Sequence, residues 1–153
     1  MSDMRSTLLF LCGALVGVFA CRQNDDPDAA EALLSDVQEA NYQGWTRAPN
    51  YPGRHVTTAP HSDEVEIFVN DIVVEALASD EPLTAWPVGS IIAKDGYTSS
   101  GELDIIALME KREDGWFWAE YAADGEVLYS GNPTICTDCH EPGADFVRAF
   151  GFE

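Results

Sequence analysis

Positive charge is scarce in this 153-residue chain. It has 8 lysines and arginines against 27 aspartates and glutamates, and its net charge is −19 at pH 7. Nucleic acid and anionic membrane surfaces would repel such a protein, so neither is expected as an electrostatic partner. The acidity favours a well-hydrated surface or a basic redox partner. Hydrophobic residues make up 46% of the chain, which is enough for the core of one domain.

The N-terminus lacks an apolar run long enough to span a bilayer. Residues 8–20 are uncharged and apolar but fall short of the ~20 residues that a transmembrane helix needs. The run follows the positive Arg5 and ends with small residues before Cys21, which resembles the lipobox of bacterial lipoproteins. We therefore expect a signal peptide over residues 1–20 and a lipid on Cys21. Cleavage after Ala20 without lipidation is the alternative.

This N-terminal pattern predicts export from the cytoplasm. The residue after Cys21 is Arg22 rather than an aspartate, so the lipoprotein pattern favours the outer membrane in a bacterium with two membranes. We expect a periplasmic protein that reaches the membrane through its lipid anchor.

Cysteine is equally scarce. The chain has four cysteines, at Cys12, Cys21, Cys136 and Cys139. The first is expected to leave with the signal peptide and the second to carry lipid. Only two remain for the folded protein, and they are separated by two residues. A disulfide scaffold is therefore not expected, although the compartment would permit one.

The last two cysteines belong to the motif Cys136-Thr137-Asp138-Cys139-His140, the pattern by which c-type haem is attached. Its two thiols form thioethers with the haem vinyl groups, and the adjacent imidazole coordinates the iron. Haem attachment of this type occurs outside the cytoplasm, in agreement with the export signal. We predict one covalent haem c whose iron is bound by His140. A zinc site would need a fourth ligand, and a redox dithiol is typical of a βαβ setting.

The chain offers few candidates for the sixth ligand of that iron. Neither methionine nor histidine occurs in the 13 residues after His140, where small electron-transfer cytochromes usually carry their axial methionine. The candidates are Met109, His55, His61 and Lys94. An open or weakly occupied distal site is favoured, which would bind small molecules such as nitric oxide. An electron-transfer cytochrome at the periplasmic face of a membrane is the alternative function.

The hydrophobic pattern predicts an α+β fold in a single domain, with an antiparallel meander and a few helices. Asp26 and Pro27 open an amphipathic helix over residues 27–42. An irregular connection is expected over residues 45–62. Asp95-Gly96, like the two later Asp-Gly pairs, is expected to interrupt a strand. The other predicted elements are strands at 64–69, 88–93, 103–111, 116–121 and 127–129, a short helix at 71–77, a loop at 82–87 and a final helix at 144–150.

Strand 116–121 is rich in aromatic residues. Alternation places Trp116 and Trp118 on one face and Phe117 and Tyr121 on the other. These side chains either form ordinary core or cover a haem. The last predicted helix offers Phe146, Val147 and Phe150 for the same purpose.

Several segments together resemble the cytochrome P-460 family, which includes the β-type cytochromes c-prime. The resemblance covers roughly residues 60–152. It divides the chain into a signal peptide (1–20), a tether with helix and loop (21–59) and a haem domain (60–153). The matching segments are Val65-Glu66-Ile67-Phe68-Val69-Asn70-Asp71, Trp86-Pro87-Val88-Gly89-Ser90-Ile91-Ile92-Ala93-Lys94, Gly115-Trp116-Phe117-Trp118-Ala119, and the attachment motif followed by Asp145-Phe146-Val147.

The resemblance implies a β-rich homodimer with one c-type haem and a ligand-accessible iron that binds nitric oxide or oxidises hydroxylamine. It also implies that Lys94 is the candidate for a lysine cross-linked to the haem edge, as in cytochromes P-460 proper. An exposed strand end is the alternative interpretation of Lys94. A distal carboxylate would come from Glu102, Asp104 or Glu120.

Overall fold

The computed structural model describes residues 25–58 and 60–152. The predicted signal peptide and the predicted lipidation site at Cys21 lie outside the described residues. Within the described ranges, none of the helices combines the length and the apolar character that crossing a membrane requires.

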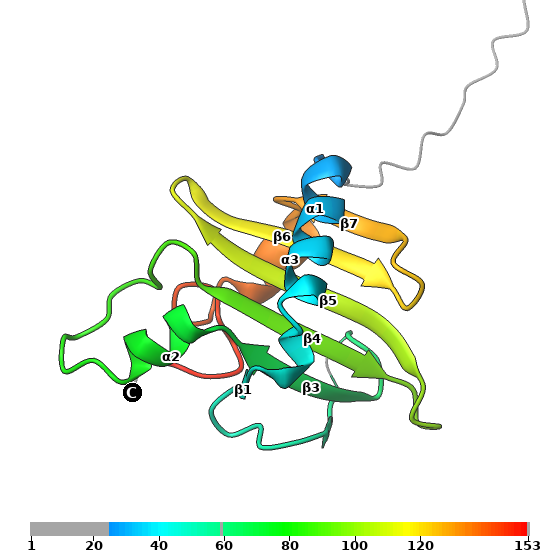
Figure 1. The fold of residues 1–153 in the computed structure, drawn as a ribbon, viewed down its shortest axis with the longest axis horizontal. Helices are drawn as coiled ribbons and strands as arrows, with labels where there is room; N and C mark the ends of the chain where they lie inside the picture. The colour runs from blue at the N-terminus through cyan, green and yellow to red at the C-terminus, as the bar shows by residue number, and fades with distance from the viewer. Residues whose placement is uncertain (1–24, 59, 153) are drawn as a thin grey trace, which may run out of the picture.

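One antiparallel sheet of seven strands organises the described chain (Figure 1). The strand order is β1-β3-β4-β5-β6-β7, and β2 pairs with β3 beside β1. The predicted α+β class and antiparallel meander are confirmed. The strands are β1 (Thr46–Arg47), β2 (His55–Val56), β3 (Glu64–Val69), β4 (Ile91–Tyr97), β5 (Leu103–Arg112), β6 (Gly115–Ala122) and β7 (Val127–Gly131).

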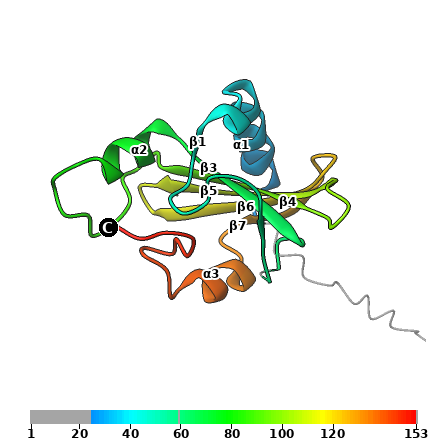
Figure 2. The same ribbon diagram turned by 90° about the horizontal axis from the view of Figure 1, so that it is seen from below.

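Helices cover both faces of this sheet. Figure 2 shows α1 on one face and α3 with the C-terminal segment on the other. The face under α1 forms one core cluster with Phe117 and Tyr121, and the opposite face forms a second with Trp116 and Trp118, as strand alternation predicts. The helices are α1 (Pro27–Glu39), the 3₁₀ turn η1 (Tyr42–Gly44), α2 (Asp71–Leu77) and α3 (Thr134–His140).

The first helix begins as its sequence predicts. The side chain of Asp26 accepts a hydrogen bond from the amide of Ala29 at 3.1 Å, and Pro27 occupies the first turn. The amides of Asp25 and Asp26 bond to the carbonyl and the hydroxyl of Ser130, at 3.2 and 3.0 Å. The start of α1 is therefore fastened to the edge strand β7.

Asp95-Gly96 does not interrupt the sheet, so the predicted strand end at this pair is wrong. Strand β4 continues to Tyr97 because both residues have tertiary partners. The buried Asp95 carboxylate accepts hydrogen bonds from the hydroxyl of Tyr42 at 2.7 Å and from the side-chain amide of Gln43 at 2.6 Å. The segment around His61 crosses β4 at Gly96. A Cβ on Gly96 would lie 2.5 Å from the carbonyl oxygen of His61, so only glycine allows this close approach.

The predicted helix over residues 144–150 is also wrong. This stretch forms a tight turn in which Ala144 and Val147 make an isolated bridge. Asp145 and Phe146 have φ angles of +46° and +67°, in the left-handed region that a helix cannot continue through. The helix of this region instead lies earlier, over the cysteine motif in α3.

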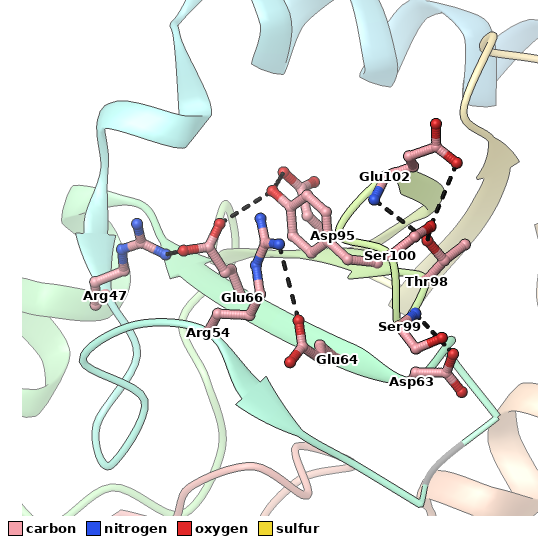
Figure 3. A network of polar contacts seen from close by, with 11 residues as sticks. Arg47, Arg54, Asp63, Glu64, Glu66, Asp95, Thr98, Ser99, Ser100 and Glu102 are labelled. Carbon is pink, nitrogen blue, oxygen red and sulfur yellow. Dashed lines mark hydrogen bonds and ion pairs between the residues drawn. The ribbon is translucent and has the colours of Figure 1, made fainter.

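The connection over residues 45–62 is less irregular than predicted, because it contributes β1 and β2 to the sheet. Side chains fasten it to β3 and β4 (Figure 3). Arg47 pairs with Glu66 at 2.7 Å and Arg54 with Glu64 at 3.8 Å. The guanidinium of Arg54 also lies 3.5 Å from the ring centre of Tyr97. The connection is therefore held to the sheet at Arg47 and at Arg54.

Gly96→Ala is expected to lower the free energy of unfolding by about 1–3 kcal/mol, because the added methyl group overlaps the backbone of His61. Gly53→Ala is the matched control, since nothing lies within 4 Å of a Cβ there. The control should change stability by less than about 1 kcal/mol. Urea unfolding measures both variants, and equal midpoints for the two would contradict the close crossing.

Alkaline pH is expected to unfold the protein through its buried tyrosines. Burial, and for Tyr42 and Tyr97 also Asp95, raises the pKa of Tyr42, Tyr97 and Tyr121. In the unfolded chain tyrosine ionises near pH ~10, so stability is complete below that pH and falls above it. The slope is up to about 1.4 kcal/mol per pH unit for each tyrosine. Tyr121→Phe should reduce the slope measured by urea unfolding between about pH 9 and pH 11, and an unchanged slope would contradict this assignment.

Candidate functional site

A cavity of about 610 Å³ lies between the sheet and α3, within the ~300–1,000 Å³ typical of cofactor and ligand sites. Its lining includes the four residues predicted to hold the haem, which are Cys136, Cys139, His140 and Lys94. The remaining wall is largely apolar and includes Ile67, Ile92, Met109 and Trp118.

The two cysteines lie on one side of α3, because residues three apart in a helix are neighbours. Both are half-buried and neither forms a disulfide. Burial raises the pKa of the Cys136 thiol to about 11, so this thiol is protonated at neutral pH. Arg148 donates hydrogen bonds to the carbonyl oxygen of Cys139 at 3.0 Å and to its sulfur at 3.3 Å. The two thiols are therefore presented together at one border of the cavity.

His140 is held in one orientation. Its Nδ1 lies 2.9 Å from the carbonyl oxygen of Phe146, and because a carbonyl only accepts, Nδ1 carries the proton. Its ring packs edge-on against Trp118, with ring centres 4.8 Å apart. Burial lowers the pKa of His140 to about 4. The imidazole is neutral at physiological pH, and its Nε2 keeps the lone pair that a metal ligand requires.

Asp145 fixes the turn that supplies this carbonyl. Its carboxylate oxygens lie 3.0 and 2.8 Å from the ammonium of Lys111, and the amide of Trp86 donates to it at 2.9 Å. The indole of Trp116 donates to the backbone carbonyl of Asp145 at 2.8 Å. These contacts offset the cost of two consecutive left-handed residues, Asp145 and Phe146. We call this set, Lys111, Asp145, Trp86 and Trp116, the Asp145 clamp.

Lys94 lies in the middle of β4, where it pairs in register with Ile67 and Ala107, and not at an exposed strand end. Alternation along the strand turns Asp95 toward α1 and places Lys94 at the cavity. Burial lowers the pKa of Lys94, and the nearby Glu120 partly opposes that effect. A less basic amine is more often deprotonated and is then a better nucleophile.

The candidates for the iron ligand opposite His140 differ in where they lie relative to the cavity. Met109 is 8% exposed, lies in the cavity wall and belongs to the core cluster on that face of the sheet. His61 lines the cavity, with its ring centre 6.3 Å from that of His140. His55 is turned elsewhere, because its Nδ1 lies 2.8 Å from the carbonyl of Gly53 and it is not part of the lining.

Among the three carboxylate candidates, Glu120 alone lines the cavity. One of its oxygens lies 3.0 Å from Nδ1 of His61. Glu102 belongs to the exposed turn after β4, where its amide bonds to the hydroxyl of Thr98, and Asp104 is exposed on β5.

Neither the role of Arg148 nor the contacts of the Asp145 clamp were predicted from the sequence. Lys111 and Trp86 lie 34 and 59 positions before Asp145, so no local pattern relates them to it. In residues 25–58 and 60–152, no group of three or more histidine, cysteine or acidic side chains is arranged to bind a metal ion. The zinc alternative therefore gains no support.

The donor set fits a covalently bound haem. Two neighbouring thiols face a largely apolar cavity beside a neutral, oriented imidazole, which are the parts that attachment and axial ligation need.

Comparison with known proteins agrees with this fit. A family model described as Cytochrome P460 matches residues 39–148, which include the sheet, the cavity wall and the cysteine motif. Curated proteins and solved structures gave no match. Because the family model covers more than half of the chain, the protein belongs to the cytochrome P460 family of haem cytochromes.

Proposed function

We propose that this protein is an exported c-type cytochrome with one haem, which binds nitric oxide or hydroxylamine at the iron face opposite His140. The observation that carries the proposal is the environment of His140. Its Nδ1 is engaged by the carbonyl of Phe146, and the residue lines the cavity together with the two cysteines of the motif.

The chain's own residues define what each part of the site would do. Cys136 and Cys139 would bind the haem edge through thioethers, and His140 would coordinate its iron. The haem would supply a metal centre that binds a diatomic or amine ligand and exchanges electrons. The apolar wall with Trp118 and Met109 would exclude water from it.

Lys94 is the residue we propose for a further covalent link to the haem. It lies at the cavity, and its burial favours the neutral amine that such a bond requires. Oxidation of hydroxylamine is the activity proposed for a linked haem, and ligand binding without turnover is the alternative.

The proposed location is the periplasmic face of a membrane, with a lipid on Cys21 as the anchor. The apolar run followed by small residues and cysteine supports it, and so does the need for haem attachment to occur outside the cytoplasm. A homodimer and a basic redox partner are part of the same proposal, the latter supported by the net charge of −19.

Protein matured with an intact haem-attachment system should carry one haem by intact mass. Cys136→Ala or Cys139→Ala should leave at most one thioether, so that the pyridine haemochrome band of the ferrous haem moves away from its position for two thioethers. Thr137→Ala is the control in the same helix turn and should leave the band at that position. Wild-type protein without haem mass would contradict the proposal. In the ferrous wild type, nitric oxide should shift the Soret band. An unchanged spectrum would contradict the proposed binding of nitric oxide.

Lys111→Met tests the support of His140. The change leaves the carboxylate of Asp145 without its cation in a site where both side chains are about 15% exposed. It should lower the free energy of unfolding by about 1–3 kcal/mol. The iron–histidine vibration, recorded from five-coordinate ferrous haem in a His61→Ala background, should also shift, because the carbonyl of Phe146 loses its fixed position. Arg112→Met, which removes an outer ion pair with Glu110, is the control and should leave that vibration unchanged. A vibration unaffected by Lys111→Met would contradict the role of the clamp.

A further inference from the structure

His61 meets the conditions of a metal-binding imidazole. Its side chain is 15% exposed, and its Nδ1 faces a carboxylate oxygen of Glu120 at 3.0 Å. A histidine that binds a metal through one nitrogen usually directs the other toward a carboxylate or a carbonyl. His140 has the same arrangement with the carbonyl of Phe146. The cavity therefore contains two imidazoles whose Nδ1 atoms are both turned to protein oxygens.

The protein does not fully satisfy His61. Its Nδ1 is buried, and its 3.0 Å approach to Glu120 lacks the alignment of a hydrogen bond. Buried polar atoms that lack a well-formed partner are uncommon and often belong to functional sites. A ligand to the ring's other nitrogen would draw the imidazole into place and allow the contact with Glu120 to align.

The separation of the two rings fits a single metal between them. Metal–imidazole bonds are about 2 Å long, so two imidazoles on opposite sides of one metal have ring centres roughly 6 Å apart. The ring centres of His61 and His140 are 6.3 Å apart, and the ring planes meet at 78°. This spacing matches that of two imidazoles bound to the same metal.

The backbone of His61 is fixed, whereas its side chain is held weakly. The carbonyl of His61 lies against Gly96, where a Cβ would approach to 2.5 Å, and this contact positions the segment across β4. Within the described part of the chain, the close polar contact of the ring is the approach of its Nδ1 to Glu120. Rotation of the side chain would therefore release the space in front of the iron without moving the sheet.

We propose that His61, supported by Glu120, coordinates the haem iron opposite His140 and is displaced when a small ligand binds. This inference rests on the haem site proposed above and describes its resting state. Ligand affinity and association rate are then set by the fraction of protein in which His61 has left the iron.

The experiment compares haem-loaded wild type with His61→Ala and with His55→Ala as matched control, because His55 comes from the same connection but lies outside the cavity lining. Electron paramagnetic resonance of the ferric protein reports its spin state. The wild type should be low-spin and six-coordinate, His61→Ala should become high-spin, and His55→Ala should remain low-spin. Carbon monoxide should bind ferrous His61→Ala at least about tenfold faster than wild type.

Two further measurements keep the test decisive. Glu120→Gln retains His61 but weakens its support, so a mixture of spin states is expected in the ferric protein. The wild-type spectrum alone overturns the proposal if it is high-spin and five-coordinate, even where His61→Ala fails to fold. A low-spin wild type that stays low-spin in His61→Ala overturns it as well. Either result leaves the haem site intact, whereas absence of covalent haem in the wild type overturns the proposed function and this inference together.

Discussion

The hydrogen bond from His140 to the carbonyl of Phe146 is the contact on which the site depends. It selects the tautomer of the imidazole and fixes its direction. The carbonyl is available only because the chain turns sharply at Asp145 and Phe146 in backbone conformations that non-glycine residues disfavour. That turn is held by Lys111 on β5 and by Trp86 and Trp116. The orientation of one imidazole thus rests on contacts from three other segments of the chain.

The two faces of the sheet bury polar side chains for different purposes. On the face under α1, the carboxylate of Asp95 is buried among donors that satisfy it, which makes it part of the core. On the opposite face, the neighbouring Lys94 borders the cavity. Adjacent residues of one strand therefore serve stability and chemistry separately, because successive side chains point to opposite faces. The same alternation assigns Tyr121 to the first face and Trp118 to the second.

The features that could be predicted from the sequence depend on local patterns. Alternation predicted most strands, the cap at Asp26 predicted α1, and the cysteine motif identified the residues that border the cavity. The errors lie where distant partners outweigh local preference. Asp95-Gly96 is typical of a turn, yet Asp95 finds Tyr42 and Gln43, and Gly96 accommodates the crossing at His61. Residues 144–150 have a helical pattern, but the Asp145 clamp stabilises a left-handed turn that no helix tolerates. His61 lies in a loop and His140 in α3, and the fold brings them together. Their spacing in the sequence does not predict this approach.

If Cys21 carries a lipid, as proposed, the bonds between the start of α1 and the sheet edge would limit how far the domain moves from a membrane. Asp25 and Asp26 bond to Ser130 on β7, so the chain is held to the sheet at these residues. With a lipid on Cys21, as proposed, the four residue steps to Asp25 reach at most about 14 Å even when fully extended. The haem domain would then stay within a thin layer above the lipid headgroups. Exchange of electrons would be restricted to partners that enter the same layer, and ligands released at the membrane surface would meet the iron at short range.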